Sequence, residues 1–369
     1  MSEQSDPLPA EPEIRYPKVI AGPCSAESIE QLLATAAALK DLPISYFRAG
    51  LWKPRSRPGA FCGVGGEGLH WLQEVRAQYG FPVMTEVAVP AHVEAALKAE
   101  VDALWLGARC VSNPFSVDEL AQALKGTKVP LYVKNPISPD RALWVGAIER
   151  LMNVGLTDIS AVFRGYNTYY TGLGDFRNTP LWNEAFALKK YFPSIPLICD
   201  PSHIAGRRKY VEPMARLAVA LGFEGLMIET HIQPEVALSD KEQQLTPQAL
   251  SELLHSLADS KALSTMPILE MMRFALDEND LAMLAIISER YKLVRKISAV
   301  KQAGNMPILQ KDQYDKKIDI LLKSAAREGL NSDFVASLFN LIHTESVRLQ
   351  EELRSESSHN KSKLTTNGQ

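Results

Sequence analysis

The chain has 369 residues and a formal net charge of −3 at pH 7. This length allows one large domain and a smaller one, and the near-balanced charge gives no sign of the basic footprint of a nucleic-acid-binding protein. No apolar run approaches the ~20 residues that cross a bilayer, residues 1–13 lack the apolar core of a secretory signal, and the four cysteines show no paired spacing. We therefore expect a cytoplasmic enzyme in two parts, with no nucleic-acid or membrane partner.

Between Lys18 and about residue 250, short apolar runs alternate eight times with amphipathic helical patterns such as 28–39, 67–79, 91–99 and 117–124. This alternation is typical of a parallel sheet covered on both faces, and eight units predict an α/β protein with a (β/α)₈ TIM barrel. An open doubly wound sheet is the alternative, but the only glycine-rich run, residues 63–66, follows no strand. The predicted strands are 18–24, 44–51, 82–87, 103–109, 130–135, 158–165, 196–203 and 225–231.

Nearly every predicted strand ends in a charged or ligating side chain, and the carboxyl ends of the strands are where a barrel keeps its chemistry. Five of these side chains are cations, which indicates a substrate with several negative charges. The set comprises Cys24, Arg48, Lys53, Glu86, Arg109, Lys134, Arg164, His203 and Glu229.

A candidate metal site combines residues from the beginning and the end of the barrel segment of the sequence. Cys24 follows the first strand, whereas His203, Glu229 and Asp240 follow the last two, and first and last strands are neighbours only in a closed barrel. A thiolate, an imidazole and two carboxylates suit Mn²⁺, Fe²⁺, Co²⁺ or Zn²⁺ without selecting among them. The alternatives are a buried thiol, helix-capping roles for His203 and Asp240, and a purely structural zinc site, which would leave the cations unexplained.

The pattern changes after residue 257. A polar linker precedes three helical segments, 267–304, 308–328 and 332–353, and no strand is predicted. The long first helix cannot bury its whole apolar stripe alone, so we expect a homodimer, or a larger homo-oligomer, formed through these helices. The predicted domains are a disordered tail 1–16, the barrel 17–257, the linker 258–266, an all-α three-helix domain 267–354 and a disordered tail 355–369.

Six ordered motifs closely resemble the 3-deoxy-D-arabino-heptulosonate 7-phosphate (DAHP) synthase family, in its short type I beta branch related to 3-deoxy-octulosonate 8-phosphate synthase. They are Ala21–Glu27, Phe47–Ser56, Gly107–Arg109, Val133–Pro136, Phe163–Gly165 and Asp200–His203. The resemblance implies a metal-dependent barrel that joins phosphoenolpyruvate to erythrose 4-phosphate and releases phosphate. It implies the metal ligands Cys24, His203, Glu229 and Asp240, with Mn²⁺ as the expected ion.

The same resemblance implies a role for each cation. Arg48 and Lys53 would hold the phosphoenolpyruvate carboxylate, and Glu86 would orient the water that attacks C2. The sister enzyme uses arabinose 5-phosphate, but the run Lys53–Ser56 matches the four-carbon sugar better. The implied catalytic residues are Cys24, Lys53, Glu86 and His203. The implied substrate contacts are Arg48, Lys53, Arg109, Lys134 and Arg164 for phosphoenolpyruvate, Arg55 and Ser56 for the sugar phosphate, and Asp200.

The C-terminal helices resemble the all-α chorismate mutase family. Arg273, Asp280, Arg290 and Lys301 follow that family's spacing, and Ser346 and Gln350 match its pair on the third helix. The second helix departs from the family, because Gln310, Gln313 and Tyr314 replace an acidic residue, an arginine and a glutamate that are common there. The implied chorismate contacts are Arg273, Arg290, Lys301, Gln310, Gln313, Ser346 and Gln350, with Arg290, Lys301 and Gln350 as catalytic residues.

Two alternatives stay open for these helices. They are the solvated face of a dimerising helix, or an allosteric sensor that binds chorismate or prephenate without turnover. Because only about 17 residues precede the first strand, feedback control of the barrel is expected to pass through the C-terminal helices. The sequence thus predicts a bifunctional enzyme of aromatic amino acid biosynthesis.

Overall fold

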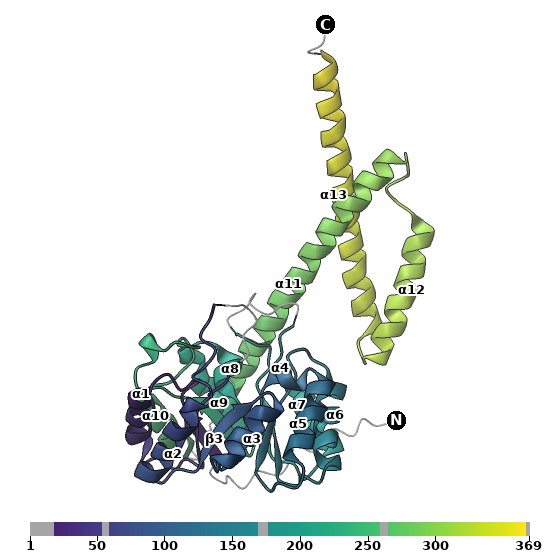
Figure 1. Cartoon of the computed structure of the whole chain (residues 1–369). Coiled ribbons are helices and arrows are strands. Elements are labelled where there is room, and N and C mark those ends of the chain that lie inside the picture. Colours follow the sequence, from purple (N-terminus) through teal and green to yellow (C-terminus); the bar gives the residue numbers. More distant parts are fainter. Residues whose placement is uncertain (1–17, 54–58, 169–175, 259–264, 367–369) are drawn as a thin grey trace. The chain divides into compact units, whose positions relative to one another are not determined.

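The computed structural model describes residues 18–53, 59–168, 176–258 and 265–366. It divides into two compact units, Met1–Asn279 and Asp280–Gln369 (Figure 1). The division falls within helix α11 (Thr265–Ala303), whereas the sequence predicted a boundary at the linker 258–266, most of which lies outside the described residues. Among the described helices, none is both long and apolar enough to cross a membrane.

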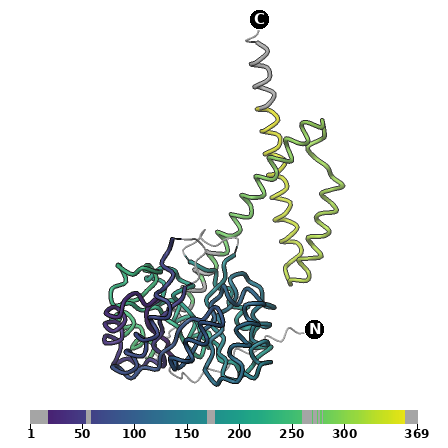
Figure 2. Tube along the Cα trace, in the orientation of Figure 1, coloured from purple at the N-terminus to yellow at the C-terminus, as the bar shows by residue number. Residues whose placement is uncertain are grey.

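The first unit is a closed barrel of eight parallel strands in sequence order. β1 pairs with β8 as well as with β2, and Gly22 lies opposite Glu229 in the register of the closing pair. The predicted barrel and all of its strands are therefore confirmed. Figure 2 shows the Cα trace of the chain, with this unit coloured from purple to green along the sequence. The strands are β1 Lys18–Gly22, β2 Tyr46–Arg48, β3 Val83–Val87, β4 Ala103–Leu106, β5 Leu131–Lys134, β6 Ile159–Phe163, β7 Leu197–Cys199 and β8 Gly225–Glu229.

Several helices around the strands begin where a polar side chain caps them. Ser28, Asn113 and Asp140 each accept a hydrogen bond from a backbone N–H in the first turn of the helix that follows. Their apolar faces pack on the outside of the barrel. The helices are α1 Ile29–Leu39, α2 Glu67–Tyr79, α3 Pro90–Lys98, α4 Ala108–Val111, α5 Pro114–Leu124, α6 Arg141–Asn153, α7 Trp182–Tyr191, α8 Pro201–Ala205, α9 Val211–Ala220 and α10 Pro247–Ala258, with short 3₁₀ turns at Arg208–Tyr210 and Pro234–Val236.

The barrel interior has an apolar layer with a polar layer above it. Side chains of a strand alternate between its two faces, so the residue two positions after an inward side chain points inward again. The apolar layer is Ile20, Met84, Ala103, Trp105, Tyr132, Val162, Ile198 and Met227. Two positions after members of this layer, or after the adjoining Tyr46, stand Arg48, Glu86, Lys134, Arg164, Asp200 and Glu229. The alternation of the strands therefore gathers these ionisable groups at one end of the barrel.

The second unit consists of long helices. α12 (Lys311–Arg327) and α13 (Ser332–Thr366) pack against one another after the long helix α11 (Figure 1). The sequence predicts a disordered tail from residue 355, and α13 extends to Thr366. No glycine or proline interrupts residues 332–366, and a polar composition by itself does not end a helix. The predicted N-terminal tail, 1–16, lies outside the described residues.

Candidate functional site

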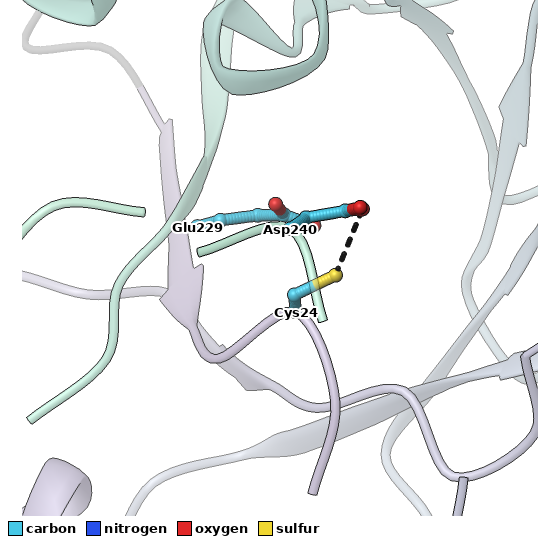
Figure 3. A group of neighbouring side chains, drawn as sticks. All are labelled: Cys24, Glu229 and Asp240. Atoms are coloured by element: carbon cyan, nitrogen blue, oxygen red, sulfur yellow. Dashed lines mark hydrogen bonds between the residues drawn. The ribbon is translucent and has the colours of Figure 1, made fainter. Parts of the chain in front are cut away.

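Three of the four predicted metal ligands lie together at the carboxyl end of the barrel. The ligand atoms of Cys24, Glu229 and Asp240 are all within 4.8 Å of one another (Figure 3). The Cys24 thiol donates to Asp240 Oδ2 at 3.3 Å. Cys24 follows β1, Glu229 ends β8 and Asp240 lies in the loop after β8, so closure of the barrel between β1 and β8 brings the three together.

The fourth predicted ligand, His203, faces the same cluster. Asp200 caps α8 by accepting a hydrogen bond from the His203 backbone N–H at 3.0 Å, and its other oxygen lies 2.8 Å from Nδ1. The remaining ring nitrogen, Nε2, is 3.8 Å from Glu229 Oε1. Burial lowers the pKa of His203 to about 4, against an opposing effect of Asp200, so the ring is neutral at pH 7. A neutral imidazole oriented by a carboxylate is the form that binds metal ions.

Two glutamines after Asp240 hold the ligand loops. The Gln244 side chain accepts a hydrogen bond from the Cys24 backbone N–H at 3.0 Å and donates to the Ser239 carbonyl at 2.9 Å. Gln243 donates to Glu229 Oε2 at 2.6 Å. Both glutamine side chains are buried, and they tie the loop of Cys24 and the end of β8 to the loop of Asp240.

The electrostatics of the cluster suit a divalent cation. Burial and the Glu229 charge raise the pKa of the Cys24 thiol to about 12. Burial opposes ionisation of Asp240 as well, but the charges of Lys53 and Arg177 outweigh it and bring the pKa of that carboxyl below its usual range. Glu229 Oε1 is buried and accepts no hydrogen bond from a described residue. A buried carboxylate oxygen that accepts no hydrogen bond, beside a thiol and a second carboxylate, fits the donor set of a metal site.

A cavity of about 360 Å³ opens beside this cluster. Glu86, His203 and Asp240 line it together with cations from several strand ends. Burial and the neighbouring Arg177 charge lower the pKa of Arg164 to about 10, which shows how densely positive charge is packed there. An anion with several charges would offset this repulsion. The lining cations are Lys53, Arg109, Lys134, Arg164 and Arg177.

Of the other barrel residues predicted for the site, two are buried at the carboxyl end of the barrel and two lie outside the described residues. Arg48 is buried, with Nη2 3.3 Å from Glu229 Oε1. Asp200 is also buried, and its Oδ2 accepts a hydrogen bond from Lys134 Nζ at 2.8 Å and lies 2.8 Å from His203 Nδ1. Arg55 and Ser56, the predicted contacts of the sugar phosphate, lie outside the described residues.

Sequence reasoning missed two groups of this site. Arg177 Nη1 lies 3.2 Å from Asp240 Oδ2 and donates to Gln243 Oε1 at 2.6 Å, so it joins both carboxylate ligands. It does not end a strand, and no local signal marks it. The Trp105 indole N–H donates to Glu86 Oε2 at 3.0 Å. Its position two residues before Gly107, on the inward face of β4, is a signal that could have found it.

The C-terminal helices bring a second group together. Arg290 Nη2 donates to Ser346 Oγ at 3.0 Å, and Gln350 Nε2 donates to the Ser346 carbonyl at 3.1 Å. Arg290 Nε and Gln350 Oε1 are buried without a hydrogen-bond partner among the described residues. Three predicted chorismate contacts thus converge between α11 and α13, with polar atoms left for a ligand.

The second helix contributes Tyr314, at a position that departs from the family, and Lys317, which the sequence analysis did not predict. Tyr314 stacks on His343 with ring centres 4.0 Å apart. Burial lowers the pKa of His343, and the charges of Arg290, Lys317 and Lys301 lower it further. Lys317 of α12 is thus a cation near Arg290, although position 313 carries none. Lys301 Nζ donates to the Ile308 carbonyl at 2.5 Å, whereas the side chains of Arg273, Asp280, Gln310 and Gln313 are exposed in the single chain.

Family models match both parts of the chain. Residues 15–265 match the DAHP synthetase I family, and residues 272–351 match chorismate mutase type II. A phospho-2-dehydro-3-deoxyheptonate aldolase of Thermotoga maritima is 35% identical over 246 residues, which cover 66% of this chain and 69% of the relative. A 2-dehydro-3-deoxyphosphooctonate aldolase of Methylobacillus flagellatus is 30% identical over 262 residues, or 65% of this chain and 89% of the relative.

Solved structures agree with the sequence matches. The crystal structure of the Thermotoga maritima DAHP synthase is 32% identical, with a TM-score of 0.59, and the match covers 67% of this chain and 71% of that one. A truncated form of the synthase from the same organism is 30% identical, with a TM-score of 0.57 over 67% of this chain and 88% of that one. The chain is therefore an enzyme that belongs to the DAHP synthetase I family through its barrel and to the chorismate mutase type II family through its C-terminal helices.

Proposed function

We propose that the barrel condenses phosphoenolpyruvate with erythrose 4-phosphate and releases phosphate, which makes it a 3-deoxy-7-phosphoheptulonate synthase. The observation that carries the proposal is the cluster of Cys24, Glu229 and Asp240 at the edge of a cavity lined by cations. Phosphoenolpyruvate carries close to three negative charges, and forked guanidinium groups recognise both its carboxylate and its phosphate.

In this proposal, different cations of the site bind the phosphate and the carboxylate of phosphoenolpyruvate. Arg109, Lys134 and Arg164 bind the phosphate. Lys53 binds the carboxylate, with Arg48, whose Nε and Nη1 have no hydrogen-bond partner among the described residues. This division holds C2 and C3 of phosphoenolpyruvate between the phosphate-binding cations and the metal-ligand cluster.

Cys24, His203, Glu229 and Asp240 would hold a divalent metal ion, with Mn²⁺ expected ahead of Fe²⁺, Co²⁺ or Zn²⁺. When bound, the ion supplies Lewis acidity toward the aldehyde oxygen of the sugar phosphate. The C2=C3 π electrons of phosphoenolpyruvate form the new bond from C3 to the aldehyde carbon as the C=O π bond breaks, and Glu86 orients the water whose oxygen bonds to C2. One proton of this water goes to the former aldehyde oxygen. The bond from C2 to the bridging oxygen then breaks, and phosphate leaves with that oxygen and the second proton while C2 becomes a ketone.

The choice of sugar rests on the run Lys53–Ser56, with Arg55 and Ser56 as the contacts of the sugar phosphate. The relatives described above bear the names of both the heptonate and the octonate enzyme. Phosphate release measured with phosphoenolpyruvate plus erythrose 4-phosphate, and in parallel with arabinose 5-phosphate, separates the two. We expect turnover with the four-carbon sugar, its loss after chelation of metal and its return with Mn²⁺. Preference for arabinose 5-phosphate would contradict the assignment.

We further propose that the helical domain converts chorismate to prephenate. The observation in its favour is the convergence of Arg290, Ser346 and Gln350, with Arg290 Nε and Gln350 Oε1 buried and unpartnered. The Nε–H of Arg290 can donate to a carboxylate of chorismate or to the charge that develops on its ether oxygen, and Gln350 Oε1 can accept a hydrogen bond from the substrate hydroxyl. The second candidate is an allosteric sensor, favoured by the absence of a cation at Gln313. Chorismate loss followed by absorbance decides between them, since binding without turnover would make the domain a sensor.

The helical domain also supports a homodimer, because large apolar side chains on α11 are exposed in the single chain. Ile286, Leu293 and Val300, spaced seven residues apart on one face of the helix, are 49%, 59% and 68% exposed. Apolar stripes of this kind are normally covered in a folded assembly. The larger oligomer and the cytoplasmic location stay predictions.

A further inference from the structure

Trp105 is fully buried inside the barrel, yet its indole makes two polar contacts that simple filling of the core does not require. Its Nε1–H donates to Glu86 Oε2 at 3.0 Å, and its ring centre lies 4.7 Å from the guanidinium carbon of Arg48. Glu86 and Trp105 are direct partners in the register of β3 and β4. One side chain therefore touches both the proposed water-orienting carboxylate and a proposed carboxylate-binding arginine.

Glu86 is confined from a second side by Gly107. A Cβ atom at Gly107 would lie 2.1 Å from Glu86 Oε1 and 2.9 Å from Cδ. The backbone of Gly107, with φ −72° and ψ 157°, is one that any residue adopts, so the glycine is needed for space and not for its conformation. The Glu86 carboxylate thus fills the room above Gly107 while the indole N–H of Trp105 holds its other oxygen.

Arg48 needs the indole for a different reason. Its side chain is only 2% exposed, and its Nε and Nη1 have no hydrogen-bond partner among the described residues. A buried cation with free donors is costly, and the face of an indole is the most favourable aromatic surface for it. The ring of Trp105 therefore stabilises the buried guanidinium of Arg48 while its free N–H donors stay available for a carboxylate ligand.

We propose that Trp105 is a positioning residue of the synthase site, which orients Glu86 through its indole N–H and supports Arg48 through its ring. The proposal rests on the synthase function proposed above. The contact with Glu86 and the contact with Arg48 are expected to affect different kinetic constants. Loss of the N–H displaces the group that orients water and lowers kcat, whereas loss of the aromatic face weakens binding of phosphoenolpyruvate and raises its KM.

The test compares Trp105→Phe with Trp144→Phe in the full-length, metal-loaded enzyme. Trp144 is equally buried, and its indole N–H donates to the Val133 carbonyl at 3.2 Å, so it controls for loss of a buried indole hydrogen bond. We expect Trp105→Phe to lower kcat at least ~10-fold with KM for phosphoenolpyruvate within about twofold of wild type. Trp144→Phe should leave both constants within about twofold, even if it lowers Tm.

Two further variants separate the halves of the proposal. Trp105→Leu, which also removes the aromatic face, should raise KM for phosphoenolpyruvate in addition. Gly107→Ala, which keeps Trp105 and its backbone conformation, should lower kcat alone by crowding Glu86. A kcat within twofold of wild type in Trp105→Phe would overturn the proposal. So would equal losses in both tryptophan variants that follow Tm, since these indicate a structural role only.

The same set distinguishes failure of this proposal from failure of the synthase function. If wild type turns over neither sugar phosphate, the synthase proposal has failed. Calorimetric titration with phosphoenolpyruvate then tests the Arg48 half alone. Weaker binding in Trp105→Leu than in Trp105→Phe supports it, and equal binding in the two overturns it.

Discussion

The barrel and the helical domain present their candidate sites in opposite ways. The barrel site is enclosed within one unit, where Cys24, Glu229 and Asp240 are held by buried partners such as Gln243 and Gln244. The helical site has a small converged group around Ser346, while Arg273 and Gln313 are exposed. A closed barrel can complete a site from its own strand ends, whereas we propose that the long helices, with their exposed apolar faces, need a second copy to complete theirs.

The strongest way to break this comparison is to remove one metal ligand from the barrel. Cys24→Ala should lower synthase turnover at least ~100-fold and reduce the bound metal, because changes that only support a ligand already cost ~10–100-fold in affinity or activity. Metal content and phosphate release measure the effect. Chorismate turnover in the same preparation is the control, and it should stay within about twofold of wild type. A parallel loss of both activities would show that the two sites are not independent.

Arg290→Ala is the corresponding change in the helical domain. Loss of a donor that stabilises developing charge typically costs ~100–1000-fold in kcat, and we expect a decrease of that order in chorismate turnover. Arg295→Ala, an exposed arginine on the same helix, is the matched control and should keep wild-type turnover. Should the two variants be equally active, Arg290 would be a structural residue and the mutase assignment would lose its main support.

The sequence predicted the barrel well because burial on both faces makes each strand a continuous apolar run. Because every second side chain of a strand points inward, Arg48, Glu86 and Glu229 can be placed at one end of the barrel whatever the conformation of the loops. Spacing also predicted that Cys24 meets Glu229 and Asp240, since closure of the barrel leaves no other arrangement of β1 and β8.

What the sequence could not predict depends on contacts between distant loops. Arg177 follows no strand, and its partner Asp240 lies in another loop of the chain. Trp105 reads as an ordinary core residue until its N–H is seen against Glu86. On α12, the cation near Arg290 is Lys317, one turn beyond Gln313, and only the packing of α12 against α13 shows this.

Leu293→Asp sharpens the comparison by testing whether the helical site needs a second copy. Leu293 is 59% exposed in the single chain, and a charge there would oppose burial of the stripe in a homodimer. Light scattering should show a shift toward monomer. Chorismate turnover should fall roughly 10-fold or more, because we expect Arg273, which is exposed in the single chain, to serve the partner's site in the dimer. Lys296→Asp, which places the same charge at an already exposed polar position on that helix, is the control. A dimer that survives Leu293→Asp with full turnover would place the interface elsewhere.

The smallest effect on catalysis is expected from deleting the helical domain, residues 260 onward. Because the barrel site draws its ligands and cations from residues before this point, synthase turnover should fall only a few-fold. Inhibition by chorismate or prephenate should disappear, since the expected route of feedback passes through the deleted helices. Phosphate release at increasing chorismate and prephenate, with the full-length chain beside the truncated one, measures both quantities. Inhibition that persists in the truncated chain would mean that the barrel itself binds the effector, and the division between a self-contained site and a regulatory helical domain would be wrong.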